Sequence, residues 1–281
     1  MARLGAGFTI IEVVIVLAIT GLLFLSAVTM FAGKRSQTEF VQAMYDLESQ
    51  IQSVLSATKS GTFQDSEKYI CVVRNNNIQP AVREPLPADP PLSEPGTRSN
   101  CLTLGRAVQA RPNDGNLYIF TVIGLAKDSA TGKPVASLKE AGPSVIAGTH
   151  SSSTADLTVI YKLISGVRVL SATIPGNSNR YDIAGFYLAP QGGSSAGQGS
   201  TFTSLAYPFE SSSTDNYEED NDEARRIEEC VLQDSALCEN SITLGRWELC
   251  LQGQNGQDRA VLSLIGVPGG VNTDLEFKDC S

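Results

Sequence analysis

One apolar run near the start of the chain limits what this sequence can fold into. Phe8–Phe31 comprises 24 residues and contains a single charged side chain, the carboxylate of Glu12. A helix of this length, rising about 1.5 Å per residue, would cross the roughly 30 Å hydrocarbon core of a bilayer. The run therefore predicts a lipid-adapted helix, and the basic pair Lys34-Arg35 follows it.

Glu12 distinguishes this run from an ordinary signal or anchor. A cleaved secretory signal would be shorter and would end in a small-residue cleavage site. A plain membrane anchor explains the length but leaves a carboxylate in lipid, which costs about 2.5–3.5 kcal/mol at the bilayer centre and less near its edge. Cleavage after Gly7 would place a new ammonium group, on Phe8, one helical turn from Glu12. Between staggered neighbouring chains these two groups would form a salt bridge in a medium of low dielectric constant.

Residues 7–12 carry a resemblance to a known family. The segment GFTIIE, followed directly by the apolar run, resembles the processing signal of type IV pilins and type II secretion pseudopilins. The resemblance implies that prepilin peptidase cuts after Gly7 and that the new terminal residue, Phe8, is methylated. It also implies that Glu12 guides the packing of subunits in a helical filament.

The same resemblance implies where the chain works and what it meets. Its partners would be the prepilin peptidase and other pilin subunits, in a filament of one or several kinds of chain. The precursor would lie in the cytoplasmic membrane, and the mature chain in an extracellular filament or a periplasmic pseudopilus.

Beyond the run, an apolar stripe continues the helical pattern. Its members recur at steps of four and three, as one face of a helix requires. They are Phe40, Met44, Leu47, Ile51, Val54 and Thr58. We expect this stripe to pack against the domain that follows, because a coiled-coil seam would need more heptads than the segment holds. The helix is predicted to run from about Phe8 to Lys59, since Ser60-Gly61 then favours a helix end.

These patterns predict an α+β fold, in which a long helix packs on an antiparallel β-sheet head with disulfides. The expected parts are a leader at 1–7, a transmembrane or filament-core helix at 8–33, an amphipathic helix half at 34–61 and a β-rich head at 62–281. A further division of the head into two lobes, about 62–190 and 200–281, is left open.

Nine segments of the head have the composition of β-strands. They are rich in Val, Ile, Leu, Tyr and Thr and are bounded by Gly, Asn, Asp and Ser. The segments are 69–74, 102–109, 117–125, 157–163, 167–174, 181–188, 242–251, 259–267 and 275–277. Residues 111–116, with Asp-Gly at the tip, predict a hairpin and hence antiparallel pairing.

A weak internal repeat links two of these regions. Residues 100–106 read NCLTLGR and residues 240–246 read NSITLGR. Two related hairpins, in two sheets or two lobes, would explain the similarity, and so would chance similarity between amphipathic strands.

Three segments interrupt the strand pattern. Residues 80–95 hold six of the 13 prolines, which predicts extended, solvated chain. Residues 191–200 have the composition of a flexible loop. Residues 215–229 hold eight acids and two arginines, and they predict a short helix whose acidic start complements the helix dipole.

The acidic segment also has an alternative interpretation as a calcium site. Asp215, Glu219, Asp220 and Asp222 would supply oxygen ligands, and some members of the pseudopilin family bind calcium near the C-terminus. The Asp-x-Asn-x-Asp-Gly spacing of a calcium-binding loop is absent, so we favour a solvated helix start without a metal.

All six cysteines lie after the apolar run. An even number in an exported domain predicts disulfides, although six cysteines allow 15 sets of pairings. We favour Cys71–Cys101, Cys230–Cys238 and Cys250–Cys280. The last pair would resemble the C-terminal disulfide loop of many pilins.

Composition and motifs offer little for catalysis or for nucleic-acid binding. The formal charge is −9 and the chain has one histidine, His150, whereas nucleic-acid binding relies on clustered Lys and Arg. Residues 193–197 match G-x-S-x-G, but they lie in low-complexity sequence with no histidine after them, so we interpret them as a loop. The sequence therefore predicts neither an enzyme nor a cofactor.

Together these features predict a structural subunit of a type IV pilus-like filament, assembled through its N-terminal helix. Cleavage would leave 281 − 7 = 274 residues, more than a common major pilin, which favours a minor or tip subunit. The alternatives are a pseudopilin of a type II secretion system and a surface binding protein with a single span that does not polymerise.

Overall fold

The computed structural model describes most of the chain. The described residues are 9–60, 70–73, 80–84, 86, 101–127, 131–147, 157–177, 181–189, 201–207, 220–232, 242–243 and 245–280. Within these ranges some side chains lie outside the description, among them those of residues 27–33.

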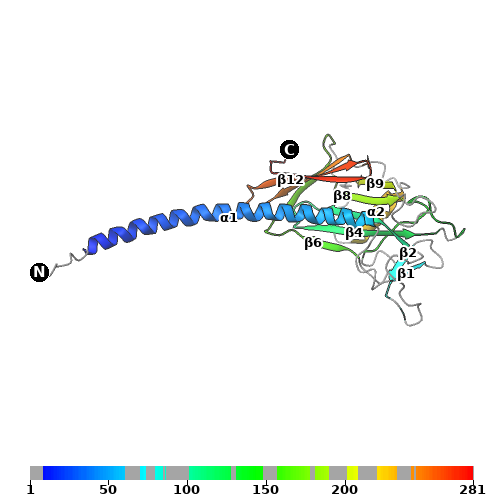
Figure 1. Ribbon diagram of the computed structural model, residues 1–281, viewed down its shortest axis with the longest axis horizontal. Helices are drawn as coiled ribbons and strands as arrows, with labels where there is room; N and C mark the ends of the chain where they lie inside the picture. Colours follow the sequence, from blue (N-terminus) through cyan, green and yellow to red (C-terminus); the bar gives the residue numbers. More distant parts are fainter. Residues whose placement is uncertain are drawn as a thin grey trace.

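One long helix, α1, gives the molecule its extended shape. It covers Ile10–Ser60, 51 residues, and at 1.5 Å per residue it is about 76 Å long. Its N-terminal half projects away from the head, and its C-terminal half runs through the head (Figure 1). The helix predicted from the sequence is therefore confirmed, with bounds shifted by one or two residues.

The C-terminal half of α1 is amphipathic, as the sequence predicts. All six residues of the predicted stripe are buried: Phe40, Met44, Leu47, Ile51, Val54 and Thr58. The opposite side of the helix, with Gln42, Ser49 and Ser53, is exposed. The stripe packs against the head of its own chain, which confirms core packing over a coiled-coil seam.

The described strands of the head form three antiparallel sheets. The largest contains β10 (Ile242–Thr243), β9 (Thr201–Tyr207), β8 (Ile183–Ala189), β3 (Cys101–Ala110), β4 (Asn116–Leu125) and β5 (Ser144–Val145) in that order, and β6 (Val159–Lys162) also pairs with β4. The second has the order β13 (Gly270–Glu276), β12 (Arg259–Val267), β11 (Arg246–Gln252) and β7 (Arg168–Thr173). The third pairs β1 (Ile70–Val73) with β2 (Pro80–Arg83).

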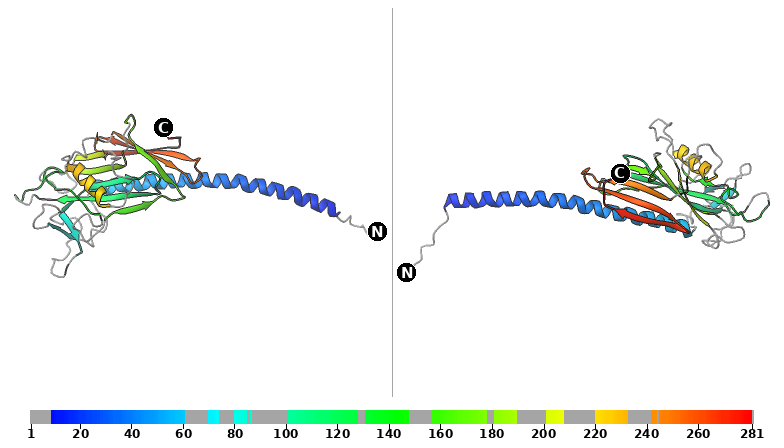
Figure 2. Two further views of the ribbon diagram at one scale, coloured as in Figure 1. Left: turned by 180° about the vertical axis from the view of Figure 1, so that it is seen from behind. Right: turned by 90° about the horizontal axis from the view of Figure 1, so that it is seen from above.

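The two larger sheets and α1 enclose the main hydrophobic core. Buried side chains of the helix stripe join Phe186 of the seven-stranded sheet and Leu249 of the four-stranded sheet in one cluster. Trp247 is fully buried, and its Nε1 donates a hydrogen bond of 2.6 Å to the carbonyl oxygen of Tyr181. Figure 2 shows the four-stranded sheet and the seven-stranded sheet flanking the buried half of α1.

The other face of the seven-stranded sheet is covered by a second helix, α2 (Asp220–Leu232). Its residues Ala224 and Ile227 are buried in a second core together with Phe120 of the sheet. Arg226 of α2 forms an ion pair of 2.7 Å with Asp182, which is almost fully buried. The short helix predicted within residues 215–229 is thus confirmed from Asp220 onward, and residues 215–219 lie outside the described residues.

The hairpin predicted at residues 111–116 is present between β3 and β4. Asn113 adopts a positive φ of 61° at its tip, a conformation that Asn tolerates well. The carboxylate of Asp114 accepts hydrogen bonds from the backbone and side-chain nitrogens of Asn116. These side-chain contacts stabilise the turn, and the positive φ falls on Asn113 and not on the predicted Asp-Gly pair.

Most other predicted strands are also present, but three predictions need correction. Residues 242–251 form two strands, β10 and β11, which lie in different sheets. β13 begins at Gly270, five residues before the predicted strand. Pro80–Arg83 forms β2 inside the segment predicted to be solvated, and Ala81 is only 2% exposed. Proline is tolerated there because it is the first residue of the strand.

Strands from distant parts of the head pair with one another. β9 and β10 join the sheet that contains β3, β4 and β8, and β7 joins β11 in the other sheet. The hairpins of the internal repeat, β3–β4 and β11–β12, also lie in different sheets. Strands that precede residue 190 therefore share both larger sheets with strands that follow residue 200.

Candidate functional site

The projecting half of α1 is an apolar surface that nothing in the described part of the chain covers. Ile10 is 85% exposed and Phe24 is 73% exposed. The other large apolar side chains exposed here are Ile11, Val13, Val14, Ile15, Val16, Leu17, Ile19, Leu22, Leu23 and Leu25. This segment, Ile10–Ser26, is called the apolar arm below.

The apolar arm is apolar on all sides. Residues 13–17 are consecutive and all exposed, and at 100° per residue they point in every direction around the helix. A helix of this kind is normally surrounded by other protein or by lipid. Burying each such side chain contributes roughly 1.5–3 kcal/mol, so an arm about 25 Å long has a strong tendency to find apolar surroundings.

The described chain contains no helix with the combined length and hydropathy that a membrane crossing requires. The predicted span, Phe8–Phe31, includes Phe8 and the side chains of residues 27–31, which lie outside the described residues.

Glu12 lies in the first turn of α1 and is exposed. Its backbone nitrogen donates to the carbonyl oxygen of Thr9 at 3.1 Å and faces the Thr9 hydroxyl at 3.4 Å. Thr9 therefore caps the helix, and Glu12 occupies the third helical position, where a carboxylate complements the helix dipole. Thr9-x-x-Glu12 fits a capping box, a signal in the sequence that the interpretation of Glu12 as a packing residue overlooks.

The polar side chain of Thr20, inside the apolar arm, is satisfied locally. The hydroxyl of Thr20 donates to the carbonyl oxygens of Val16 at 2.9 Å and Leu17 at 3.1 Å. Glu12 is therefore the only charged side chain between Ile10 and Ser26. An ion pair made by a side chain of the arm would therefore involve this carboxylate.

The buried half of α1 is held on two sides by polar contacts. On one side Tyr161 of β6 donates a hydrogen bond of 2.5 Å to Asp46. Burial, together with this bond, raises the pKa of Tyr161 above its usual value. On the other side Gln52 donates to the hydroxyl of Thr273 at 2.9 Å, and that hydroxyl donates to Glu48 at 2.8 Å. These contacts fix the rotation and depth of α1 in the head.

The C-terminal disulfide predicted from the sequence is confirmed. Cys250 of β11 is bonded to Cys280, with a Cα–Cα distance of 5.7 Å. Cys101 and Cys230 are also disulfide-bonded. Their predicted partners, Cys71 and Cys238, have side chains outside the described residues, so those two pairings stay predictions.

The remaining predicted site residues are only partly covered by the structure. Gly7 and Phe8, the predicted processing site, lie outside the described residues. Asp215 and Glu219 do so as well, and Asp220 and Asp222 are described only as backbone positions at the start of α2. In the part of the head with described side chains, no three Asp, Glu, His or Cys residues are grouped as metal ligands.

Three comparisons with known proteins identify no relative of this chain. No protein-family model, curated protein or solved structure matches the chain.

Proposed function

We propose that this chain is a structural subunit of a type IV pilus-like filament, assembled through the apolar arm. The observation that carries the proposal is the continuity of α1. One helix is apolar on all sides over its projecting half and buried along one stripe over the other half. Such a helix joins the head rigidly to whatever surrounds the arm.

Other copies of the same chain, or closely similar subunits, suit the arm best. Arms packed side by side bury each other's apolar side chains, and each head, which is much wider than a helix (Figure 1), stays outside the bundle. When one such contact joins different surfaces of two copies, its repetition from copy to copy produces an open helical filament. Before assembly, the lipid of the cytoplasmic membrane would surround the arm.

The finer parts of the proposal concern the start of the chain. Prepilin peptidase would cut after Gly7 and leave a methylated Phe8. The ammonium group of Phe8 in one copy would pair with the exposed carboxylate of Glu12 in the next. The length of the head favours a minor or tip subunit over a major one.

The capping role of Glu12 gives a sharp test of this pairing. Glu12→Gln removes the charge but keeps a side chain that serves the third position of a capping box, whereas Thr9→Ala removes the cap and keeps the charge. If Glu12 pairs with a neighbour, Glu12→Gln should be lost from sheared filaments and remain in the membrane fraction. Glu39→Gln is the matched control, because Glu39 pairs with Arg35 at 2.7 Å on the helix surface outside the arm.

The other outcomes of these experiments would contradict parts of the proposal. Incorporation of Glu12→Gln at the level of Glu39→Gln, with loss of Thr9→Ala, would assign Glu12 to helix capping. Absence of even the unaltered chain from sheared filaments, with all of it in the membrane, would favour the surface binding protein that does not polymerise. Mass spectrometry of the mature N-terminus should show methylated Phe8, and an intact Met1 would contradict the processing.

A further inference from the structure

A small set of contacts holds α1 at the point where it leaves the head. Phe40 is the first buried residue among the described side chains of α1. Phe277 lies edge-on to Phe40 and to Tyr45, with ring centroids 6.3 and 6.2 Å apart. The β11–β12 turn adds Gly253, whose backbone lies against the Phe40 ring, and Asn255, whose Nδ2 is 3.5 Å from Ser36 Oγ. Phe277 and this turn are called the exit collar below.

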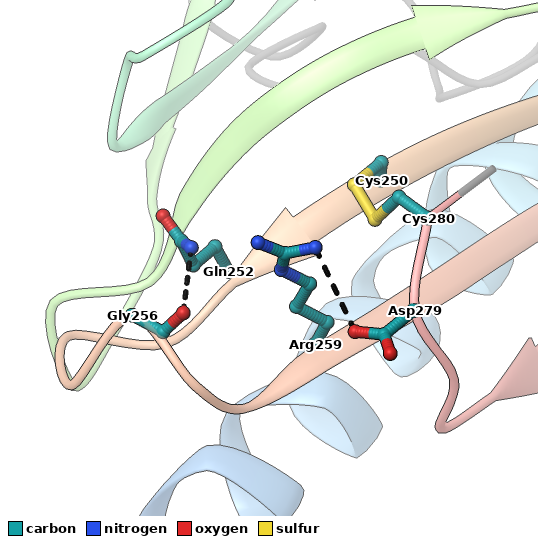
Figure 3. Close-up of a disulfide and its surroundings, with 6 residues drawn as sticks. All are labelled: Cys250, Gln252, Gly256, Arg259, Asp279 and Cys280. Atoms are coloured by element: carbon teal, nitrogen blue, oxygen red, sulfur yellow. Dashed lines mark hydrogen bonds and ion pairs between the residues drawn. A yellow bond between two sulfur atoms is a disulfide. The ribbon is translucent and has the colours of Figure 1, made fainter.

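The C-terminal disulfide holds the collar together. Leu249 and Leu251 point into the main core, so Cys250 between them lies on the opposite face of the four-stranded sheet. The chain that follows β13 crosses β12 on that face to bring Cys280 to Cys250, and Asp279 passes 3.6 Å from Arg259 (Figure 3). Phe277 is thus three residues from a covalent anchor.

The other contact of this tail is weak by comparison. Asp279 is 87% exposed and its ion pair with Arg259 is long, and an exposed pair of this kind contributes little. The ion pair between Lys278 and Glu276 joins the tail only to the last residue of β13. The β12–β13 ladder ends at the pair Val261–Glu276, directly before Phe277. Phe277 is therefore held between the end of this ladder and the disulfide.

We propose that the Cys250–Cys280 disulfide is a latch that closes on oxidation and fixes the exit of α1 from the head. In the reduced chain the Sγ–Sγ bond is broken, and the two sulfurs take up two electrons and two protons from a dithiol, which becomes a disulfide itself. The tail beyond β13 then becomes free to move, and Phe40 and Tyr45 lose their edge-to-face contacts with Phe277. Transfer of the two electrons to a disulfide oxidant closes the latch again. The proposal concerns a single chain and does not rest on filament assembly.

Hydrogen–deuterium exchange of the full chain in detergent micelles tests the latch. A dithiol would also reduce the disulfides of Cys101 and Cys230, so the open state is made with the double variant Cys250→Ala/Cys280→Ala. We expect amides at residues 36–45 to exchange about tenfold faster than in the oxidised chain, as the loss of two edge-to-face contacts suggests. Amides at residues 51–58 of the same helix should be unchanged.

Phe277→Ala opens the collar while the disulfide stays in place. It should reproduce the faster exchange at residues 36–45, and the triple variant should add nothing to it, because both changes act through the same ring. Val267→Ala is the control, since Val267 is a half-exposed apolar residue of the same sheet away from the collar, and it should have no effect.

Three results would overturn the latch. They are unchanged exchange at residues 36–45 in the double variant, an additive effect in the triple variant, and equally faster exchange over residues 36–58, which would make the disulfide a general staple of the head.

Discussion

Tyr161 and Asp46 connect the sheet to α1 through a single hydrogen bond of 2.5 Å. The bond uses the phenolic proton, so it exists only while Tyr161 is protonated. Burial and the carboxylate of Asp46 raise the pKa of Tyr161 in the folded chain, while the pKa in the unfolded chain stays near 10. The stability that this proton provides is therefore complete below about pH 10 and is lost as the pH rises through the folded pKa.

This linkage predicts how Tyr161→Phe should behave. At pH 8 the variant should be less stable than the unaltered chain by about 1 kcal/mol, because the hydrogen bond is lost. Between about pH 10 and pH 11.5 the gap should narrow, because only the unaltered chain loses the contribution of Tyr161. Urea denaturation at each pH measures this difference in the free energy of unfolding. Tyr45→Phe, on the exposed side of the same helix, should show no gap at either pH, and a constant gap for Tyr161→Phe would refute the assignment.

At the residue scale, the sequence predicted side chains with a periodic or chemical signature and missed those defined by distant partners. The six stripe residues of α1 and the pair Cys250–Cys280 were predicted because spacing and count identify them. The bond between Tyr161 and Asp46 spans 115 positions, and no local pattern marks it. Phe277 looked like the end of a strand, and its contact with α1 depends on where the sheet lies.

Both halves of α1 contain leucines, but in opposite environments. Leu47 is fully buried in the main core, whereas Leu23 is exposed on the apolar arm. The same truncation at these two positions therefore separates head stability from the role of the arm.

Leu47→Ala should destabilise the head by about 2–5 kcal/mol, the usual cost of removing a buried leucine side chain. Leu23→Ala should leave head stability unchanged and weaken incorporation into filaments. Urea denaturation of the head and the amount of chain in sheared filaments are the two measurements. A loss of head stability with Leu23→Ala would mean that the arm folds back on the head in solution.

At the element scale, strands with strong patterns were predicted and strands defined by pairing were not. β4 and β12 have long apolar sequences and appear within one residue of their predicted bounds. β5 has two residues and exists through its pairing with β4. β9, with its Thr and Ser residues, pairs along its full length with β8, and only that neighbour makes it a strand.

At the scale of the whole molecule, all described core residues follow the arm. Among the described side chains of α1, Phe40 is the first that is buried, and the two large hydrophobic cores lie in the head. A chain that begins at Lys34 should therefore fold with its Cys250–Cys280 disulfide intact. It should sediment as a monomer in water without detergent, whereas the full chain should need detergent or associate. Association of the shortened chain would show that the head itself carries a strong contact between copies.

The sheet membership of the strands could not be predicted from sequence. The division of the head near residues 190–200 follows a change of composition, yet β9 and β10 return to the sheet of β3 and β8. Pairing between segments more than 50 residues apart depends on the geometry of the entire head. The α+β class could be predicted, because it depends only on the types of element present.

The direction of β13 along α1 has a mechanical consequence. Phe277 meets Phe40, Thr273 meets Gln52, and Gly270 lies beside Lys59, so strand and helix run antiparallel side by side for most of the buried half. A pull on the arm along its axis would slide the helix past the strand and load all these contacts at once. The contacts between α1 and β13 would then be loaded in shear and would have to break together. Breaking them one at a time would require a force directed across the helix axis.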